Sequence, residues 1–180
     1  MSKIWIVLLG IGLLTACGGS SFEPGVYSME DMCVVQVETE EQICYGMTQS
    51  EIDAVLGEGT EGSLGWMEYD GGATIAYRDG VAAGLMLDRS SADKYRTARG
   101  AEVGMSKQEI KLLYGDNPAS EHADNNLDYY YDSEEDQALE QLPRKSQEEM
   151  MDIYVFSFLQ LGDGADRIML LDARMAMYFE

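Results

Sequence analysis

Side chains able to carry out a reaction are few in this sequence. The only histidine, His122, lies in a polar stretch beside Glu121 and Asp124, where a base and two carboxylates come together. A solvated loop histidine explains the same residues, because no nucleophile or phosphate-binding motif accompanies them. We therefore expect a protein that is not an enzyme.

Carboxylates are abundant, with 33 Asp and Glu residues against 12 Lys and Arg residues. They occur in runs such as Glu134–Asp136, or as Asp163 and Asp166, without the spacing of an EF-hand. Two cysteines with one histidine make a poor zinc site. The sequence predicts no metal and no cofactor, and weak calcium binding stays open as an alternative. The net charge of −21 argues against nucleic acid as a partner.

The first residues have the pattern of an export signal. Lys3 precedes the apolar run Ile4–Leu14, which is short for a membrane-spanning helix, and the sequence Leu-Thr-Ala-Cys then ends at Cys17. This segment resembles the lipobox of bacterial lipoproteins. The resemblance implies that residues 1–16 are a cleaved signal peptide and that Cys17 is lipidated. An ordinary secretory signal cleaved near Ala16 is the alternative.

A lipobox also implies an extracytoplasmic protein anchored to a bacterial membrane, with the cytoplasmic and outer membranes both left open. Residues 17–32 are predicted to be the lipidated cysteine and a flexible tether, which starts as Gly-Gly-Ser-Ser. Disulfides persist outside the cytoplasm. Cys33 and Cys44 flank a short segment that a disulfide would close, and two buried free thiols are the alternative.

One short segment occurs twice. Residues 46–57 and 104–115 share Gly, Met, a hydroxyl residue, Glu, Ile and a closing Gly at one constant offset. Thr48 and Ser106 are suited to cap a helix, and a glutamate three residues later completes a capping box. Apolar residues then follow at helical spacing. Each copy is predicted to be a short amphipathic helix, which needs a sheet to pack on.

Strand-like segments and hairpin signals follow each predicted helix. Gly164 and Asp172 match Gly80 and Asp88 at one offset, so the closing hairpins also correspond. Ala173–Phe179 alternates in the manner of an edge strand. The predicted fold class is α+β, a tandem repeat of a short helix and an antiparallel β-meander, with the helices on one sheet face. The predicted units are a first repeat at 33–88, a linker at 89–100, and a second repeat at 101–180 with an acidic insertion at 132–150.

The repeated signature, Gly-Met-Thr/Ser-x-x-Glu-Ile followed by a meander, carries a family resemblance. It resembles the domain of outer-membrane assembly lipoproteins of the SmpA/OmlA (BamE) type. It also resembles the tandem repeats of the β-lactamase inhibitor protein. The resemblance covers residues 33–88 and 95–179, and it implies a fold more directly than a function. The acidic insertion departs from the shared pattern, and no inhibitory residue of the inhibitor family maps onto this chain.

Aromatic residues are the stronger clue to function. Large rings alternate along two predicted strands, and one face of such strands can contact a partner. We expect a lipid-anchored envelope protein acting as a non-catalytic protein-binding or assembly module. The alternative is an inhibitor of an extracytoplasmic enzyme. The candidate binding surface consists of Tyr129, Tyr130, Tyr131, Tyr154, Phe156 and Phe158.

Overall fold

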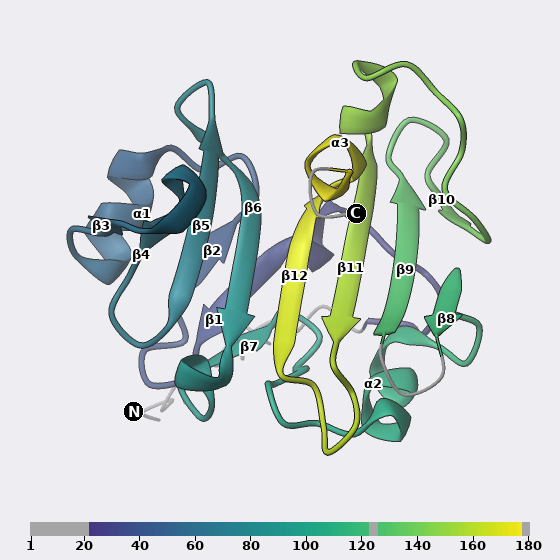
Figure 1. Cartoon of the computed structure of the whole chain (residues 1–180), viewed down its shortest axis with the longest axis horizontal. Coiled ribbons are helices and arrows are strands. Elements are labelled where there is room, and N and C mark those ends of the chain that lie inside the picture. Colours follow the sequence, from purple (N-terminus) through teal and green to yellow (C-terminus); the bar gives the residue numbers. More distant parts are fainter. Residues whose placement is uncertain (1–21, 123–125, 178–180) are drawn as a thin grey trace, which may run out of the picture.

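A computed structural model describes residues 22–122 and 126–177 (Figure 1). Within them the chain forms two antiparallel sheets and a few short helices, so the predicted α+β class is confirmed. No helix in this part is long and apolar enough to cross a membrane. The small sheet contains β1 (Cys33–Gln36), β2 (Gln42–Cys44) and β7 (Tyr95–Thr97). The α-helices are α1 (Gln49–Leu56), α2 (Lys107–Tyr114) and α3 (Ala173–Ala176).

The large sheet has nine strands, and its centre is the pairing of β6 with β12. From there it continues through β5, β4 and β3 on one side, and through β11, β9 and β10 on the other, with β8 also on β9. Its strands are β3 (Thr60–Glu61), β4 (Met67–Glu68), β5 (Ala73–Arg78), β6 (Val81–Asp88), β8 (Ser120–His122), β9 (Asn126–Asp132), β10 (Gln137–Leu139), β11 (Ile153–Leu159) and β12 (Arg167–Asp172).

The main core lies between one face of the large sheet and the small sheet, which Figure 1 shows behind it. Ile52 of α1 and Ile110 of α2 belong to the same buried cluster as Leu85 and Phe156 of the large sheet. The Tyr114 and Phe158 rings meet edge to face, with 4.8 Å between their centroids. Burial of these apolar side chains is the main source of stability.

Both sequence-predicted helices form at the expected positions, and each begins with a complete capping box. The Thr48 hydroxyl accepts a hydrogen bond from the Glu51 amide, and the Thr48 amide donates to the Glu51 carboxylate at 2.8 Å. Ser106 and Glu109 repeat this arrangement, again with a 2.8 Å bond to the carboxylate. These bonds satisfy amides that would otherwise lack a partner in the first turn.

We expect Thr48→Ala and Ser106→Ala each to lower the free energy of unfolding by about 1 kcal/mol, because each removes one cap of the same design. Urea denaturation of the purified protein measures this, with Ser63→Ala as the control because Ser63 starts a 3-10 helix without a side-chain cap. A cost for Ser63→Ala equal to that of the cap variants would contradict the capping explanation.

The capping boxes also predict a dependence on pH. The Thr48 hydroxyl and amide lower the pKa of Glu51 below its ordinary 4.5, and Ser106 lowers the pKa of Glu109 in the same way. A carboxyl with a lowered pKa stabilises the fold fully above the ordinary value, and this contribution is lost as the pH falls through the folded-state value. The Glu51→Gln, Glu109→Gln double variant should therefore lose less stability than the wild type on acidification below pH 4.5. Urea midpoints across that range measure it, and parallel curves for the two proteins would refute it.

Two predicted segments were wrong. Residues 89–100 are not a linker, because β7 pairs with β1 and Tyr95 is buried. The acidic insertion, whose structure the sequence left open, contains β10 paired with β9, a loop in which Lys145 bonds Asp132 at 2.9 Å, and a 3-10 helix at Glu149–Met151. Ala173–Ala176 is a helix and not an edge strand, because Asp172 caps it through the Met175 amide.

Candidate binding face

Most of the aromatic residues proposed as a binding surface belong to the core, so that prediction was wrong. Tyr129, Tyr131, Tyr154, Phe156 and Phe158 are at most 8% exposed. The register explains why: Tyr131 lies opposite Tyr154, and Tyr129 opposite Phe156, so their rings share the face that meets the small sheet. Burial, with a hydrogen bond to Asp136, raises the pKa of Tyr131 to about 12. Tyr130 alone points to the other face, where it is half-buried.

The other face of the large sheet carries the candidate site. Alternation places Arg167, Met169 and Leu171 of β12 on this face, while Ile168 and Leu170 point into the core. Cross-strand pairing extends the surface on both sides: Met169 lies opposite Met86 on β6 and opposite Ser157 on β11. We call this surface the open face. Its members include Trp66, Thr74, Met86, Asp88, Asp128, Tyr130, Val155, Ser157, Leu159, Arg167, Met169 and Leu171.

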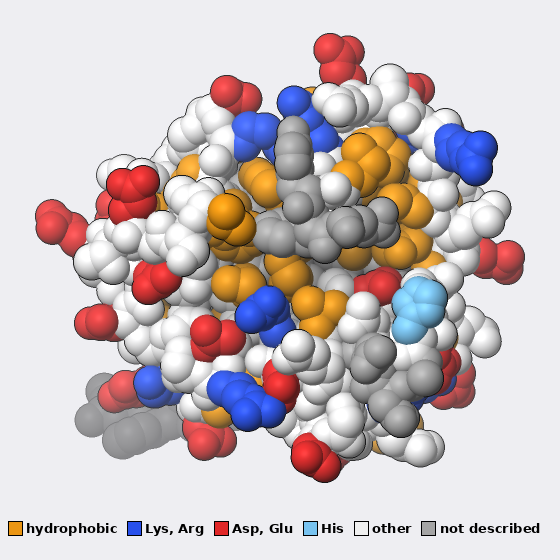
Figure 2. Space-filling view, viewed as in Figure 1, with side chains coloured by type: hydrophobic (Ala, Val, Ile, Leu, Met, Phe, Trp, Pro, Cys, Tyr) orange, Lys and Arg blue, Asp and Glu red, His pale blue; other side chains and the backbone are white. Residues whose placement is uncertain are grey.

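The open face is hollowed by two adjoining depressions. One holds about 300 Å³ over β9, β11 and β12 and is bordered by α3. The other holds about 630 Å³ over β4, β5, β6 and β12. Leu159, Arg167 and Met169 line both, so the two depressions meet along β12. Figure 2 shows hydrophobic side chains gathered in the middle of this face, with acidic side chains mostly toward its rim.

Gly84 leaves room for the Trp66 ring on the floor of the open face. Gly84 on β6 lies opposite Leu171, and a Cβ atom on Gly84 would lie 3.3 Å from the Trp66 ring. Trp66 and Leu171 pack in one cluster with Met169, with Met175 of α3 against it. The apolar floor is thus a packed layer, with Trp66, Met169 and Leu171 at most 7% exposed, and the apolar area left for another protein is mainly that of the half-buried Met86 and Leu159.

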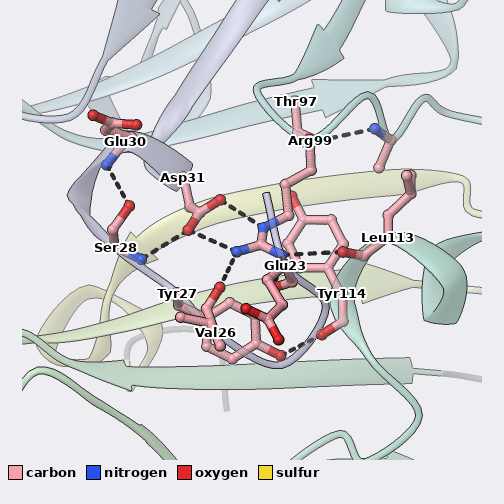
Figure 3. A network of polar contacts seen from close by, with 11 residues as sticks. Glu23, Val26, Tyr27, Ser28, Glu30, Asp31, Thr97, Arg99, Leu113 and Tyr114 are labelled. Atoms are coloured by element: carbon pink, nitrogen blue, oxygen red, sulfur yellow. Dashed lines mark hydrogen bonds and ion pairs between the residues drawn. The ribbon is translucent and has the colours of Figure 1, made fainter. Parts of the chain in front are cut away.

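The most conspicuous ion pair of the molecule lies elsewhere, beneath the other face of the sheet (Figure 3). Arg99 is buried and donates to both carboxylate oxygens of Asp31, at 2.6 and 3.0 Å. It also donates to the carbonyl oxygens of Glu23, Val26 and Leu113. These five bonds use all five N–H groups of a guanidinium. Because no donor remains for a ligand, the pair is structural.

That ion pair fastens the segment in front of β1 to the domain. The Gly25 amide and the Tyr27 hydroxyl both donate to the Tyr114 carbonyl at the end of α2, at 3.0 and 2.6 Å. Met32 is fully buried. The predicted tether over residues 17–32 is therefore wrong for its described part, since residues 22–32 belong to the folded domain. Cys17 and residues 18–21 lie outside the described residues.

The remaining residues singled out for chemistry are not brought together. His122 is exposed on β8, whereas Glu121 bonds Lys107 and Lys111 of α2 at 2.9 and 2.7 Å. Asp124 lies outside the described residues. Asp166 forms a bidentate bond with Arg89. Among residues 22–122 and 126–177, no group of His, Cys, Asp or Glu side chains is arranged to hold a metal ion.

Cys33 and Cys44 form a disulfide between β1 and β2, where the two residues are paired across the strands. This is the pairing that their spacing favoured. It encloses a short acidic turn, so it restrains the small sheet, and both residues lie away from the open face.

The residues of the open face were missed by the sequence reasoning, although one signal for them was present. Residues 168–171, Ile-Met-Leu-Leu, form a continuous apolar run, which places apolar side chains on both faces of a strand but leaves undecided which face the small sheet covers. The fold and site together define an α+β protein with one sheet face in the core and the opposite face hollowed and partly open. No family model, curated protein or solved structure matches the chain.

Proposed function

We propose that this chain is a non-catalytic protein-binding module of the bacterial cell envelope, anchored through a lipid on Cys17. The single observation that supports binding is the open face, with two adjoining depressions over the central strands. Trp, Tyr and Arg are the residue types enriched at the energetic centres of interfaces. Tyr130, which is half-buried, and Arg167, which is exposed, line this face, whereas Trp66 is 7% exposed and packs in its floor. The lipobox-like sequence supports the anchor.

We further propose that the module arose as a tandem repeat, with both helices packed on one sheet face. Matching hydrogen bonds support this. Gly46 and Met47 exchange bonds with Ala82, and Gly104 and Met105 exchange the same bonds with Ala165. By these bonds Ala165 corresponds to Ala82. This alignment of the two halves is shifted by one residue from the alignment in which Gly164 matches Gly80. The duplication then sets Met86 and Met169 against each other at the centre of the sheet.

Site-specific photo-crosslinking in intact cells tests the binding proposal. A photoreactive residue at Met86 or Leu159, both half-buried on the open face, should give a covalent adduct with a discrete envelope protein. The same residue at Leu112, which is 71% exposed on α2, is the control and should give none. Adducts from Leu112 alone, or from no position, would refute the proposal. Inhibition of an extracytoplasmic hydrolase by the purified protein would instead favour the inhibitor alternative.

A further inference from the structure

The open face carries an unpaired cation. Of the eleven Lys and Arg residues in the described part, seven are in ion pairs. The Arg167 side chain is exposed and forms no hydrogen bond or ion pair with any other residue of that part, although acidic side chains outnumber basic ones almost threefold; among those residues it shares this state with Arg144, which is in a loop. Arg167 lies on a central strand of the sheet and not on a loop.

Two carboxylates near Arg167 in the sheet form no ion pair with it. Asp88 is its cross-strand neighbour, but one oxygen of the Asp88 carboxylate accepts hydrogen bonds from the Ser90 amide and hydroxyl, at 2.8 and 2.6 Å. On the other side, Asp128 accepts a hydrogen bond from the Ser157 hydroxyl. The guanidinium is therefore available for an external acceptor, and a carboxylate matches its planar pair of donors best.

The surroundings of Arg167 favour a protein over a small molecule. Small-molecule sites enclose most of their ligand, whereas the two depressions beside Arg167 are only partly enclosed. Leu159 lines both depressions and Met86 lines the second, and both are half-buried, so apolar groups of a partner beside a bound carboxylate would cover them. An arginine at the centre of an apolar surface is the usual arrangement of an interface hot spot.

The charge of the whole chain adds a second requirement. A net charge of −21 repels an acidic partner at long range and attracts a basic one. Asp88 and Glu68, at the edge of the second depression, add to this local acidity. A partner that offers a carboxylate to Arg167 and is also attracted by the acidic chain has a basic surface with one acidic side chain at its centre.

We propose that Arg167 is the anchor of the open face and that it binds an Asp or Glu carboxylate of a partner protein. On that partner, apolar residues flank the carboxylate and basic residues surround them. This inference rests on the proposed function, since it names the chemistry of the partner at the same face. The apolar residues occupy the two depressions, and the basic residues face the acidic rim.

Two capped peptides test this chemistry directly. The probe is Lys-Phe-Glu-Leu-Lys, and its twin carries Gln in place of Glu. Titration of each into the full-length protein in detergent, followed by NMR, should show the Glu peptide binding about tenfold more tightly, because only it pairs with the guanidinium. The shifted signals should include the Trp66 indole and the Arg167 side chain.

Variants then assign the preference to one residue. Arg167→Gln should abolish the difference between the two peptides, while Arg167→Lys should retain part of it. Arg144→Gln is the matched control, because Arg144 is also an exposed cation but lies in the loop after β10 and lines neither depression; it should leave the difference unchanged. Thermal unfolding of each variant confirms that the fold is retained.

The outcomes separate this inference from the function on which it rests. Equal binding of both peptides, a preference that survives Arg167→Gln, or no binding at millimolar concentration overturns the role of Arg167. The proposed function stands in those cases if Met86 and Leu159 still crosslink a partner in cells. Without such crosslinks the binding face itself is wrong, whatever the peptides show.

Discussion

Replacing Arg99 with methionine is expected to lower the free energy of unfolding by about 3–5 kcal/mol, because it leaves the buried Asp31 carboxylate without its cation. Asp31 would keep only its bond from the Ser28 amide. Three carbonyl oxygens, at Glu23, Val26 and Leu113, would also lose a donor. A loss of this size is a large part of the stability of a typical domain. Urea denaturation of the purified protein measures it.

The double variant Arg99→Met, Asp31→Leu provides the critical comparison. Replacing both members of a buried pair with apolar residues avoids the uncompensated charge, so the double variant should be more stable than Arg99→Met alone. Tyr114→Phe is the control within the same cluster. The Tyr114 hydroxyl is buried without a hydrogen-bond partner of normal geometry, although Thr97 lies close enough to oppose the rise in pKa that burial causes. Its removal should change stability little. A small effect of Arg99→Met would show that the pair does not fasten the segment.

Replacing Gly164 with alanine should cost about 3–5 kcal/mol, because the change combines backbone strain with a steric clash. Gly164 has a φ of 120°, which L side chains rarely adopt, and an added Cβ atom would lie 2.2 Å from the Gly104 carbonyl oxygen. That contact holds the β11–β12 hairpin against the loop before α2, where Gly104 also donates to Ala165.

Gly80→Ala separates the two causes. Gly80 occupies the β5–β6 hairpin with a φ of 82°, but nothing lies within 4 Å of its added Cβ atom. This variant should therefore show the strain alone, at about 1 kcal/mol. Thermal or urea unfolding of both variants measures the difference. Equal losses would mean that the Gly104 backbone moves away freely, so the loop before α2 would not be held by this contact.

Local signals in the sequence were enough to predict several elements. Hydroxyl and glutamate residues at capping spacing placed α1 and α2, since a capping box is satisfied within a single turn. Asp79-Gly80 similarly placed the β5–β6 hairpin. Helix α3 had a readable signal too, because Asp172 precedes Ala-Arg-Met-Ala, but apparent alternation was given more weight.

The residues of the candidate site could not be predicted, because they depend on which face of the sheet is covered. Phe156 and Ser157 are neighbours in β11, yet only the small sheet behind Phe156 makes one face core and leaves the other open. That small sheet includes β7, which comes from a polar segment and gains its place by pairing with β1. Its formation is a tertiary effect, and no local pattern in residues 89–100 indicates it.

The packing of residues 22–32 against the domain limits how far the domain can lie from a lipid anchor on Cys17. Phe22 already lies against the domain, where Arg99 stacks on its ring, so the proposed lipid on Cys17 is only five residues away along the chain. Fully extended, such a stretch spans roughly 18 Å. A lipid on Cys17 would therefore confine the domain to a thin layer at the bilayer surface. A partner protein would have to lie in the same layer. Confinement of the domain and its partner to that layer would raise the effective concentration of one for the other, without any additional contact.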